Sequence, residues 1–228
     1  MIALHKFGIV MVCIMVFEPS GAAQSPAGYR NFEFGMSVAS VAEQAQVKPS
    51  TARTIYTTPS LIQTLQWDSP GYFSSSSESD PVRSIQFNFY DDQLFKIIAT
   101  YGRRELEGMT TDDLIEGVSR VYGEPSTPNE TVLIMTFTSY EDRETVLAQW
   151  EDGDGIFALY KSSLGGEFGL VGYSEKLDML AAVAIREAKR LEAQAAPQRI
   201  LDRREKEAEE MRVREEAARS VNKPNFRP

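Results

Sequence analysis

The chain has 228 residues, of which 42% are hydrophobic and 25% are charged, and its formal net charge is −9 at pH 7. This composition is ordinary for a globular protein with one medium domain or two small ones. The negative charge argues against wholesale binding to nucleic acid or to anionic lipid, because both partners are themselves negative.

Residues 1–23 predict a secretory signal peptide. His5 and Lys6 supply a short, weakly basic start, and the apolar stretch 7–17 follows. Small residues then offer a cleavage site before Gln24. The apolar stretch is too short to span a bilayer, which needs about twenty residues. We therefore expect an exported protein, periplasmic or secreted, with an uncleaved anchor or a buried helix as the alternatives.

The signal peptide contains the only cysteine, Cys13, and the only histidine, His5. Cleavage after residue 23 would remove both, which excludes Cys/His zinc sites, cysteine nucleophiles, histidine triads and intramolecular disulfides from the mature chain. The alternative is that Cys13 is lipidated, although no small residue stands just before it.

Two eleven-residue stretches set the organisation of the mature chain. Residues 35–45 and 108–118 share the pattern G-M-[ST]-x-x-x-[VL]-[AI]-E-x-[AV]. We interpret each stretch as the start of a helix that opens one copy of a repeated unit. The predicted divisions are a leader at 24–34, a first unit at 35–107, a second unit at 108–174, a C-terminal helix at 175–221 and a tail at 222–228.

The first unit is predicted to be a helix followed by strands. Ser37 is the expected N-cap of a helix that reaches about Gln46, and Pro49 ends it. The last two strands alternate apolar and polar residues around a turn at 90–93, which predicts a β-hairpin. The expected strands are 53–57, 61–67, 83–89 and 94–101.

The second unit repeats this pattern. Thr110 or Thr111 is expected to cap a helix that ends near Gly123, a candidate left-handed C-cap. The apolar face of this helix is expected to be Leu114, Val118, Val121 and Tyr122. Strands are expected at 131–139, 145–150, 156–160 and 168–173. The predicted fold class is therefore α+β, a duplicated helix-plus-antiparallel-strands unit followed by a long charged C-terminal helix.

Residues 175–221 predict that helix, with a break near Pro197. Acid-before-base pairs four residues apart beyond the proline indicate a solvated helix, free to reach a partner or to zip with a second copy. The part before the proline is expected to pack on the sheet through a seam of Leu177, Ala181, Ala184, Ala188, Leu191 and Ala195.

Few residues are candidates for chemistry. The segment 151–155 (EDGDG) resembles the opening of a calcium loop, but strands flank it, so a hairpin turn is the prediction. Asp91 and Asp92 are likewise expected at a turn tip. Trp67 and Trp150 are expected to pack in the core. We therefore name no catalytic, cofactor-binding or metal-binding residue.

The loop at 68–81 offers the candidate partner contacts. Tyr72 and Phe73 stand there among serine, glycine and proline residues. Exposed aromatic residues in a long loop suit contact with a protein partner. The alternative is that both side chains pack back on the sheet.

The G-M-S start of the first helix, Trp67 and the alternating stretch 85–89 recur in known envelope proteins. Together with the second start, G-M-T, and Y-G-E-P at 122–125, they resemble the BamE/SmpA-type outer-membrane assembly lipoproteins. The chain is also similar to tandem β-lactamase-inhibitor proteins, over about 32–173. It departs from both, since it lacks a lipobox cysteine and disulfide cysteines. The resemblance implies a noncatalytic protein-binding scaffold outside the cytoplasm.

The sequence therefore predicts an exported, noncatalytic protein-interaction module. Its protein partner is unknown, and we expect no cofactor, no nucleic acid and no transmembrane span after signal cleavage. Two alternatives remain. One is an exported hydrolase that uses carboxylates such as Asp152 and Asp154. The other is a structural homo-oligomer assembled through the C-terminal helix.

Overall fold

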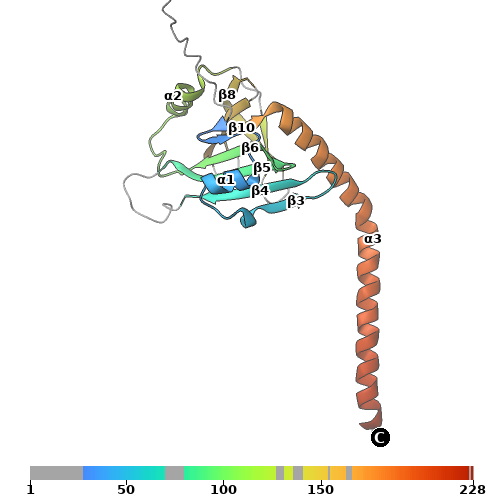
Figure 1. Cartoon of the computed structure of the whole chain (residues 1–228). Helices are drawn as coiled ribbons and strands as arrows, with labels where there is room; N and C mark the ends of the chain where they lie inside the picture. The colour runs from blue at the N-terminus through green and yellow to red at the C-terminus, as the bar shows by residue number, and fades with distance from the viewer. Residues whose placement is uncertain are drawn as a thin grey trace, which may run out of the picture.

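An eight-stranded antiparallel sheet forms the body of the protein, and a long helix crosses it and projects beyond (Figure 1). This arrangement confirms the predicted α+β class. The computed structural model describes residues 28–69, 80–126, 131–135, 141–153, 155–162, 166–225 and 227, without the side chains of 131–135, 141–143 and 152.

The elements follow one another in nearly the predicted order. The helices are α1 (Val38–Gln44), η1 (Pro49–Thr51), α2 (Thr111–Tyr122), α3 (Glu175–Asn222) and η3 (Lys223–Asn225). The strands are β1 (Gly28–Tyr29), β2 (Phe32–Glu33), β3 (Arg53–Tyr56), β4 (Ile62–Asp68), β5 (Val82–Tyr90), β6 (Gln93–Tyr101), β7 (Thr131–Met135), β8 (Glu141–Asp152), β9 (Gly155–Lys161) and β10 (Phe168–Ser174).

The strand order is β3-β4-β5-β6-β10-β9-β8-β7, and every neighbouring pair is antiparallel. Each half of the chain therefore contributes one four-stranded meander, and the two meanders meet where β6 pairs with β10. Ile98 lies opposite Val171 at this junction. The same element order in both halves supports the predicted duplication, which itself stays a prediction.

Local signals place α1 and its neighbours. The Ser40 N–H donates to the Ser37 hydroxyl (3.2 Å), as expected for an N-cap. Asp91 and Asp92 form the two-residue turn between β5 and β6, both with positive φ, as a primed hairpin turn requires. The Val38 N–H donates to the Asp92 carboxylate (2.9 Å), so this turn also holds the start of α1.

The start of α2 is a capping box, in which the Asp113 N–H donates to the Thr110 hydroxyl and the Thr110 N–H donates to the Asp113 carboxylate. At its other end Gly123 has a φ of 83° and a ψ of −161°. The positive φ was expected, but the left-handed helical C-cap was not the right prediction, because the chain extends at once toward β7.

The main core lies between one face of the sheet and α1, α2 and the β1–β2 hairpin. Trp150, Phe87 and Phe157 are fully buried there, and Trp67 packs against them in part, so both tryptophans pack as predicted. The predicted apolar face of α1 also lies in this core: Val38, Val41, Ala42 and Ala45.

The opposite face is covered by the first part of α3. An extra residue in β6, Phe95, forms a bulge opposite β5 and packs with Ile62, Ala181 and Ile185. Beside it the Lys96 ammonium pairs with the Asp178 carboxylate of α3 (2.7 Å). The predicted packing of this part of the helix is confirmed for Ala181, Ala184 and Ala188, which are buried.

The expected break near Pro197 is wrong. Helix α3 runs from Glu175 to Asn222 without interruption, with Pro197 inside it. A proline removes one intrahelical hydrogen bond and costs about 3 kcal/mol, but good helix formers on both sides each add to a helix that the sheet has already nucleated. No described helix is both long enough and apolar enough to cross a membrane.

Within the predicted leader (24–34), glycine, proline and serine made 24–31 an expected loose segment, and this expectation is wrong for the part that the structure describes. Residues 28–33 form a small hairpin, and its aromatic residues Tyr29 and Phe32 are buried in the main core. The rings of Phe32 and Phe87 lie 4.5 Å apart. Residues 24–27 lie outside the described residues. The glycine and proline residues suggested a loop here, but burial of two aromatic rings stabilises the hairpin by more than these residues disfavour it.

The segment 151–155 is a hairpin turn, as predicted, since Asp152 pairs with Gly155 at the end of β8 and β9. Asp154 itself lies outside the described residues.

The packing near the junction between the meanders predicts that substitution of one glycine, Gly172, destabilises the protein. A Cβ atom on Gly172 would lie 2.5 Å from the buried ring of Phe157. Gly172→Ala should therefore lower the free energy of unfolding by about 1–3 kcal/mol through overpacking. Chemical denaturation followed by circular dichroism measures this.

The matched control is Gly117→Ala, at an exposed position inside α2 where a Cβ would meet nothing within 4 Å. It should raise stability by up to about 1 kcal/mol, because alanine favours a helix. Equal effects of the two substitutions would contradict the described packing.

Candidate ligand-binding cleft

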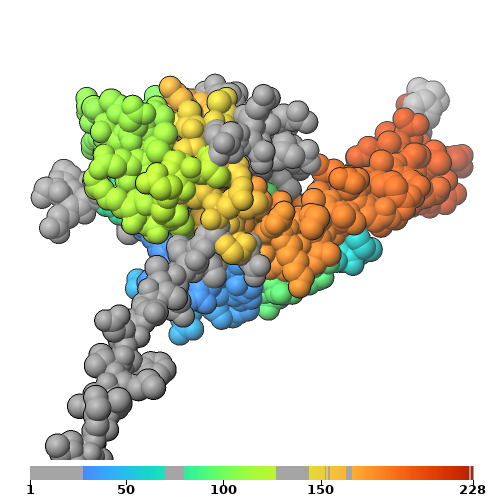
Figure 2. Space-filling view, turned by 90° about the horizontal axis from the view of Figure 1, so that it is seen from above, coloured from blue at the N-terminus to red at the C-terminus, as the bar shows by residue number. Residues whose placement is uncertain are grey.

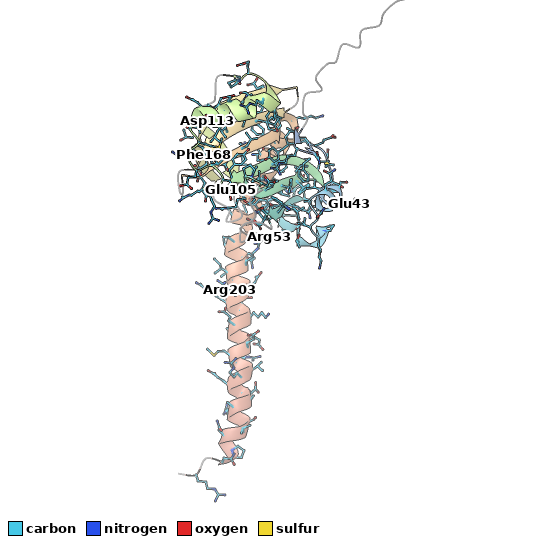
Figure 3. All side chains as sticks on the ribbon, turned by 90° about the vertical axis from the view of Figure 1, so that its left-hand side faces the viewer. Glu43, Arg53, Glu105, Asp113, Phe168 and Arg203 are labelled. Atoms are coloured by element: carbon cyan, nitrogen blue, oxygen red, sulfur yellow. The ribbon has the colours of Figure 1, made fainter. Side chains whose placement is uncertain are left out.

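A cleft of about 740 Å³ lies between α2 and the sheet. Figure 3 faces this side of the body, with Glu105 and Asp113 labelled at the cleft. Its polar lining comes from three tyrosines and three charged residues, Tyr29, Tyr101, Tyr122, Arg30, Glu105 and Asp113. Its apolar lining includes Leu106, Met109, Leu114, Val118, Val121, Leu159 and Leu170.

Helix α2 is anchored to the sheet along its length. Leu114 is buried, and Val118 and Tyr122 pack against the main core. Val121 is 62% exposed and leaves apolar surface uncovered beside the cleft. The predicted apolar face is therefore correct for Leu114, Val118 and Tyr122 and wrong for Val121.

The end of the helix is also held by hydrogen bonds. The Trp150 indole N–H donates to the Ser119 hydroxyl (3.2 Å) and to the Gly123 carbonyl oxygen (3.0 Å).

Three tyrosines from distant parts of the chain meet at the cleft. The side chains of Tyr29 and Tyr101 hydrogen-bond to each other. The Tyr122 hydroxyl donates to the carbonyl oxygen of Gly28 (3.3 Å), and its ring stacks on Phe157 at 4.2 Å between centroids. A Cβ on Gly28 would lie 1.8 Å from the Phe32 carbonyl oxygen, so the hairpin needs glycine there.

The three hydroxyl groups are held in their neutral form. Burial raises the pKa of Tyr29 and of Tyr122, and raises the pKa of Tyr101 well above its ordinary value. A neutral phenol donates and accepts hydrogen bonds, whereas nucleophilic or general-base chemistry would need the phenolate. The cluster is therefore suited to holding a ligand.

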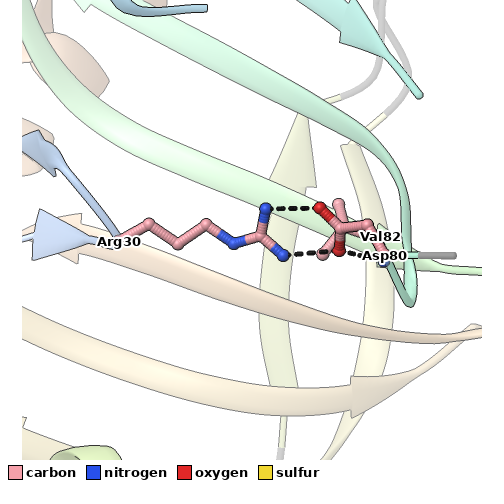
Figure 4. Close-up of polar contacts among 3 residues, drawn as sticks. All are labelled: Arg30, Asp80 and Val82. Carbon is pink, nitrogen blue, oxygen red and sulfur yellow. Dashed lines mark hydrogen bonds and ion pairs between the residues drawn. The ribbon is translucent and has the colours of Figure 1, made fainter. Parts of the chain in front are cut away.

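An ion pair closes one end of the cleft. The Arg30 guanidinium donates two hydrogen bonds to the Asp80 carboxylate, of 2.7 and 2.6 Å (Figure 4). Asp80 also accepts from the Val82 N–H (3.0 Å), so the pair joins the β1–β2 turn to the start of β5. The hydrogen bonds with Asp80 raise the pKa of Arg30, and those from Arg30 lower the pKa of Asp80.

Asp113, which lines the cleft, and Asp80, which pairs with the lining residue Arg30, are poor candidates for general acids. Hydrogen bonds from Thr110 lower the pKa of Asp113, and those from Arg30 lower the pKa of Asp80. A carboxyl group that donates a proton near neutral pH needs a raised pKa instead. Within the described residues, no group of three His, Cys, Asp or Glu side chains is placed to hold a metal ion.

The sequence did not find this cleft. The predicted contact residues Tyr72 and Phe73 lie outside the described residues. Tyr122 was placed on the face of α2, but Tyr29 fell in the expected leader and Tyr101 at the end of a strand. The three lie far apart along the chain, so no local spacing joins them. The sequence did offer one indication of the cleft. The predicted apolar face of α2 includes Val121, which the core leaves exposed.

Comparisons with known proteins add little. No protein-family model matches the chain, and a search of curated proteins finds no match. Among solved structures, the chain is similar to a cysteine-rich secretory protein from Staphylococcus aureus, with a TM-score of 0.30 and 7% sequence identity. The similarity covers 68% of this chain and about half of that protein, 48%. A likeness this weak carries no argument about function, and it does not bear on the resemblance to envelope proteins.

The Arg30–Asp80 pair predicts a pH dependence of stability. Because the pKa of Asp80 is lowered on folding from an ordinary value of 3.8, the pair stabilises the protein above that pH, and this contribution is lost as pH falls below it. We expect the pair to contribute about 0.5–1 kcal/mol at pH 6, since both side chains are partly exposed.

The measurement compares the protein with Asp80→Asn at pH 6 and at pH 2.5 by chemical denaturation. The difference in free energy of unfolding between them should shrink at the lower pH. Arg30→Gln, alone and with Asp80→Asn, closes a double-mutant cycle. A difference that is the same at both pH values, or additive effects, would show that the pair does not act as described.

Proposed function

We propose that this protein is an exported, noncatalytic protein-interaction module that holds an apolar segment of a partner protein in the cleft beneath α2. The observation that carries the proposal is apolar surface left exposed at the cleft. Met109 and Val121 line an open cleft of about 740 Å³, yet both side chains remain exposed to solvent.

The lining of the cleft favours a peptide as the occupant. Most of the lining is apolar, with a few polar groups that can fix orientation, as in ligand sites generally. Tyrosine, methionine and arginine, which line this cleft, are the residue types enriched where proteins meet. Met109, 42% exposed, and Val121, 62% exposed, are surface residues that a partner segment would cover.

The polar groups suit the backbone of an extended segment. The Tyr122 hydrogen is used by the Gly28 carbonyl oxygen, and one hydrogen is used between Tyr29 and Tyr101. The remaining hydroxyl hydrogen can donate to a peptide carbonyl oxygen, and the hydroxyl oxygens can accept from a peptide N–H. Arg30 is already engaged by Asp80, so it would shape the end of the cleft rather than bind an anionic group. The apolar wall would then select the side chains of the segment, and the hydroxyl groups would fix the position of its backbone.

The noncatalytic part of the proposal rests on the protonation states at the cleft. The raised pKa values of the tyrosines leave no phenolate to act as a nucleophile or a general base near neutral pH, and the lowered pKa of Asp113 leaves its carboxyl group ionised, so that it is no general acid.

Export is the second part of the proposal, and it rests on residues 1–23 of the sequence. Intact-mass measurement of the protein recovered from outside the cytoplasm should give a chain that begins at Gln24. Lipidation of Cys13 would instead give a longer chain with the added mass of acyl groups. A full-length chain retained in the cytoplasm would contradict export.

The cleft can be tested with peptides selected from a random phage-displayed library. We expect the selected peptides to share apolar or aromatic residues and to bind Val121→Asp at least about tenfold more weakly, because a charge would enter the apolar wall. Tyr122→Phe should have a smaller effect, because it removes one hydroxyl and keeps the ring.

The matched control is Val183→Asp, on the exposed side of α3. Val183 is 62% exposed, as Val121 is, but it lies outside the cleft. Peptides that lose affinity equally with both substitutions, or that protect α3 rather than α2 in hydrogen exchange, would show that the cleft is not the binding site. If no peptide is selected and a small apolar molecule binds tightly, the cleft is a site for a small ligand and the proposed peptide occupant is wrong.

A further inference from the structure

The C-terminal part of α3 is a helix without a partner in the described structure. All of residues 196–222 are exposed, and the helix leaves the body on the side away from α2 (Figure 2). At about 1.5 Å per residue this part is about 40 Å long. It carries large apolar side chains in solvent, which are Ile200, Leu201, Met211, Val213 and Val221.

Two of these apolar side chains, Leu201 and Met211, belong to one stripe. Six positions alternate in spacings of three and four residues, the spacing of the seam in a coiled coil. They are Leu201, Arg204, Ala208, Met211, Glu215 and Ala218. Four of the six are apolar, and the other two carry opposite charges at matching distances from the centre of the stripe.

We propose that this stripe pairs with the same stripe of a second copy of the chain, in an antiparallel two-helix coiled coil centred between Glu209 and Glu210. Leu201 then faces the partner's Ala218, and Ala208 faces the partner's Met211. Each of these apolar layers joins a large side chain to a small one. Arg204 faces the partner's Glu215, so the two charges in the seam neutralise each other. Because the pair is two-fold symmetric, each of these contacts occurs twice.

The positions beside the seam agree with the same register. Glu207 lies opposite the partner's Arg214, and Glu205 lies opposite the partner's Arg212. The exposed Ile200 lies opposite the partner's Val221. In the single chain Arg212 contacts Glu209 (2.8 Å) at the surface, so a rotation of exposed side chains would bring it to the partner. Val213 stays outside the interface.

A parallel pair in register does not offer this complementarity. It would place Arg204 against the partner's Arg204 and Glu215 against the partner's Glu215. Two like-charge layers within one short seam would oppose association. The charges therefore select the antiparallel orientation.

The length of the free helix fits the proposed register. The pairing runs from Pro197 to Asn222, the last helical residue, and Pro197 lies opposite the partner's Asn222. The paired part therefore begins just after Ala195, the last residue of α3 that is partly buried. The proposal concerns α3 alone and does not depend on what the cleft binds.

The test is the dissociation constant of the full chain, measured by sedimentation equilibrium. Each single charge reversal, Arg204→Glu or Glu215→Arg, creates two like-charge layers in the antiparallel pair and should weaken association at least about tenfold. The double reversal, Arg204→Glu with Glu215→Arg, restores both layers and should restore association. In a parallel pair the single reversals would leave like charges as they are.

Glu216→Arg is the control, because Glu216 is exposed on α3 and lies outside the seam and its flanks. It should leave the dissociation constant unchanged, and circular dichroism should give equal helix content for all variants. A chain that stays monomeric at 100 μM would overturn the proposal. So would single reversals that associate normally, or a double reversal that fails to recover.

Discussion

The sheet carries apolar side chains on both faces, and the structure depends on covering it twice. One face is covered by three separate pieces, α1, α2 and the β1–β2 hairpin. These pieces do not meet completely, and the cleft lies where they leave the sheet open. On the other face the described covering element is α3, which packs there through Ala181 and Ile185 and is longer than the sheet that it covers. Both surfaces for which we propose partners therefore result from the way the sheet is covered.

Local chemistry made most of the fold predictable. Ser37 and Thr110 act as caps, and Asp91 with Asp92 makes the hairpin turn, because each of these roles needs only a few adjacent residues. The alternation along β5 was equally clear, since one face of that strand is apolar. The β1–β2 hairpin was missed because two residues per strand are too short for any period to appear. The break at Pro197 was predicted wrongly because the free-energy cost of a proline inside a helix was considered without the stability of the long helix on either side of it.

The cleft could not be predicted from the sequence, for a different reason. A pattern of residues indicates which side of α2 is apolar, but it does not give the area of the surface that the helix meets. Here that surface is smaller than the apolar face of the helix, so Val121 remains uncovered. The hydroxyl groups at the cleft belong to Tyr29, Tyr101 and Tyr122, and the contact of Tyr122 with Gly28 joins residues 94 positions apart. Only the tertiary structure brings such groups together.

The pairing of β6 with β10 also orders the steps by which the chain can fold. The first meander consists of sequential hairpins and can form as soon as its own residues are available. Its last strand, β6, pairs with β5 on one side, and its other side stays an open edge at Ile97, Ile98 and Ala99 until almost all of the second unit has followed. Helix α3 comes directly after β10, so the second face is covered at the same late moment. A chain that is synthesised from its N-terminus would thus pass through a stage in which the edge of β6 is exposed and can pair with other chains. Its resistance to aggregation then depends on how soon β10 is made and pairs with β6.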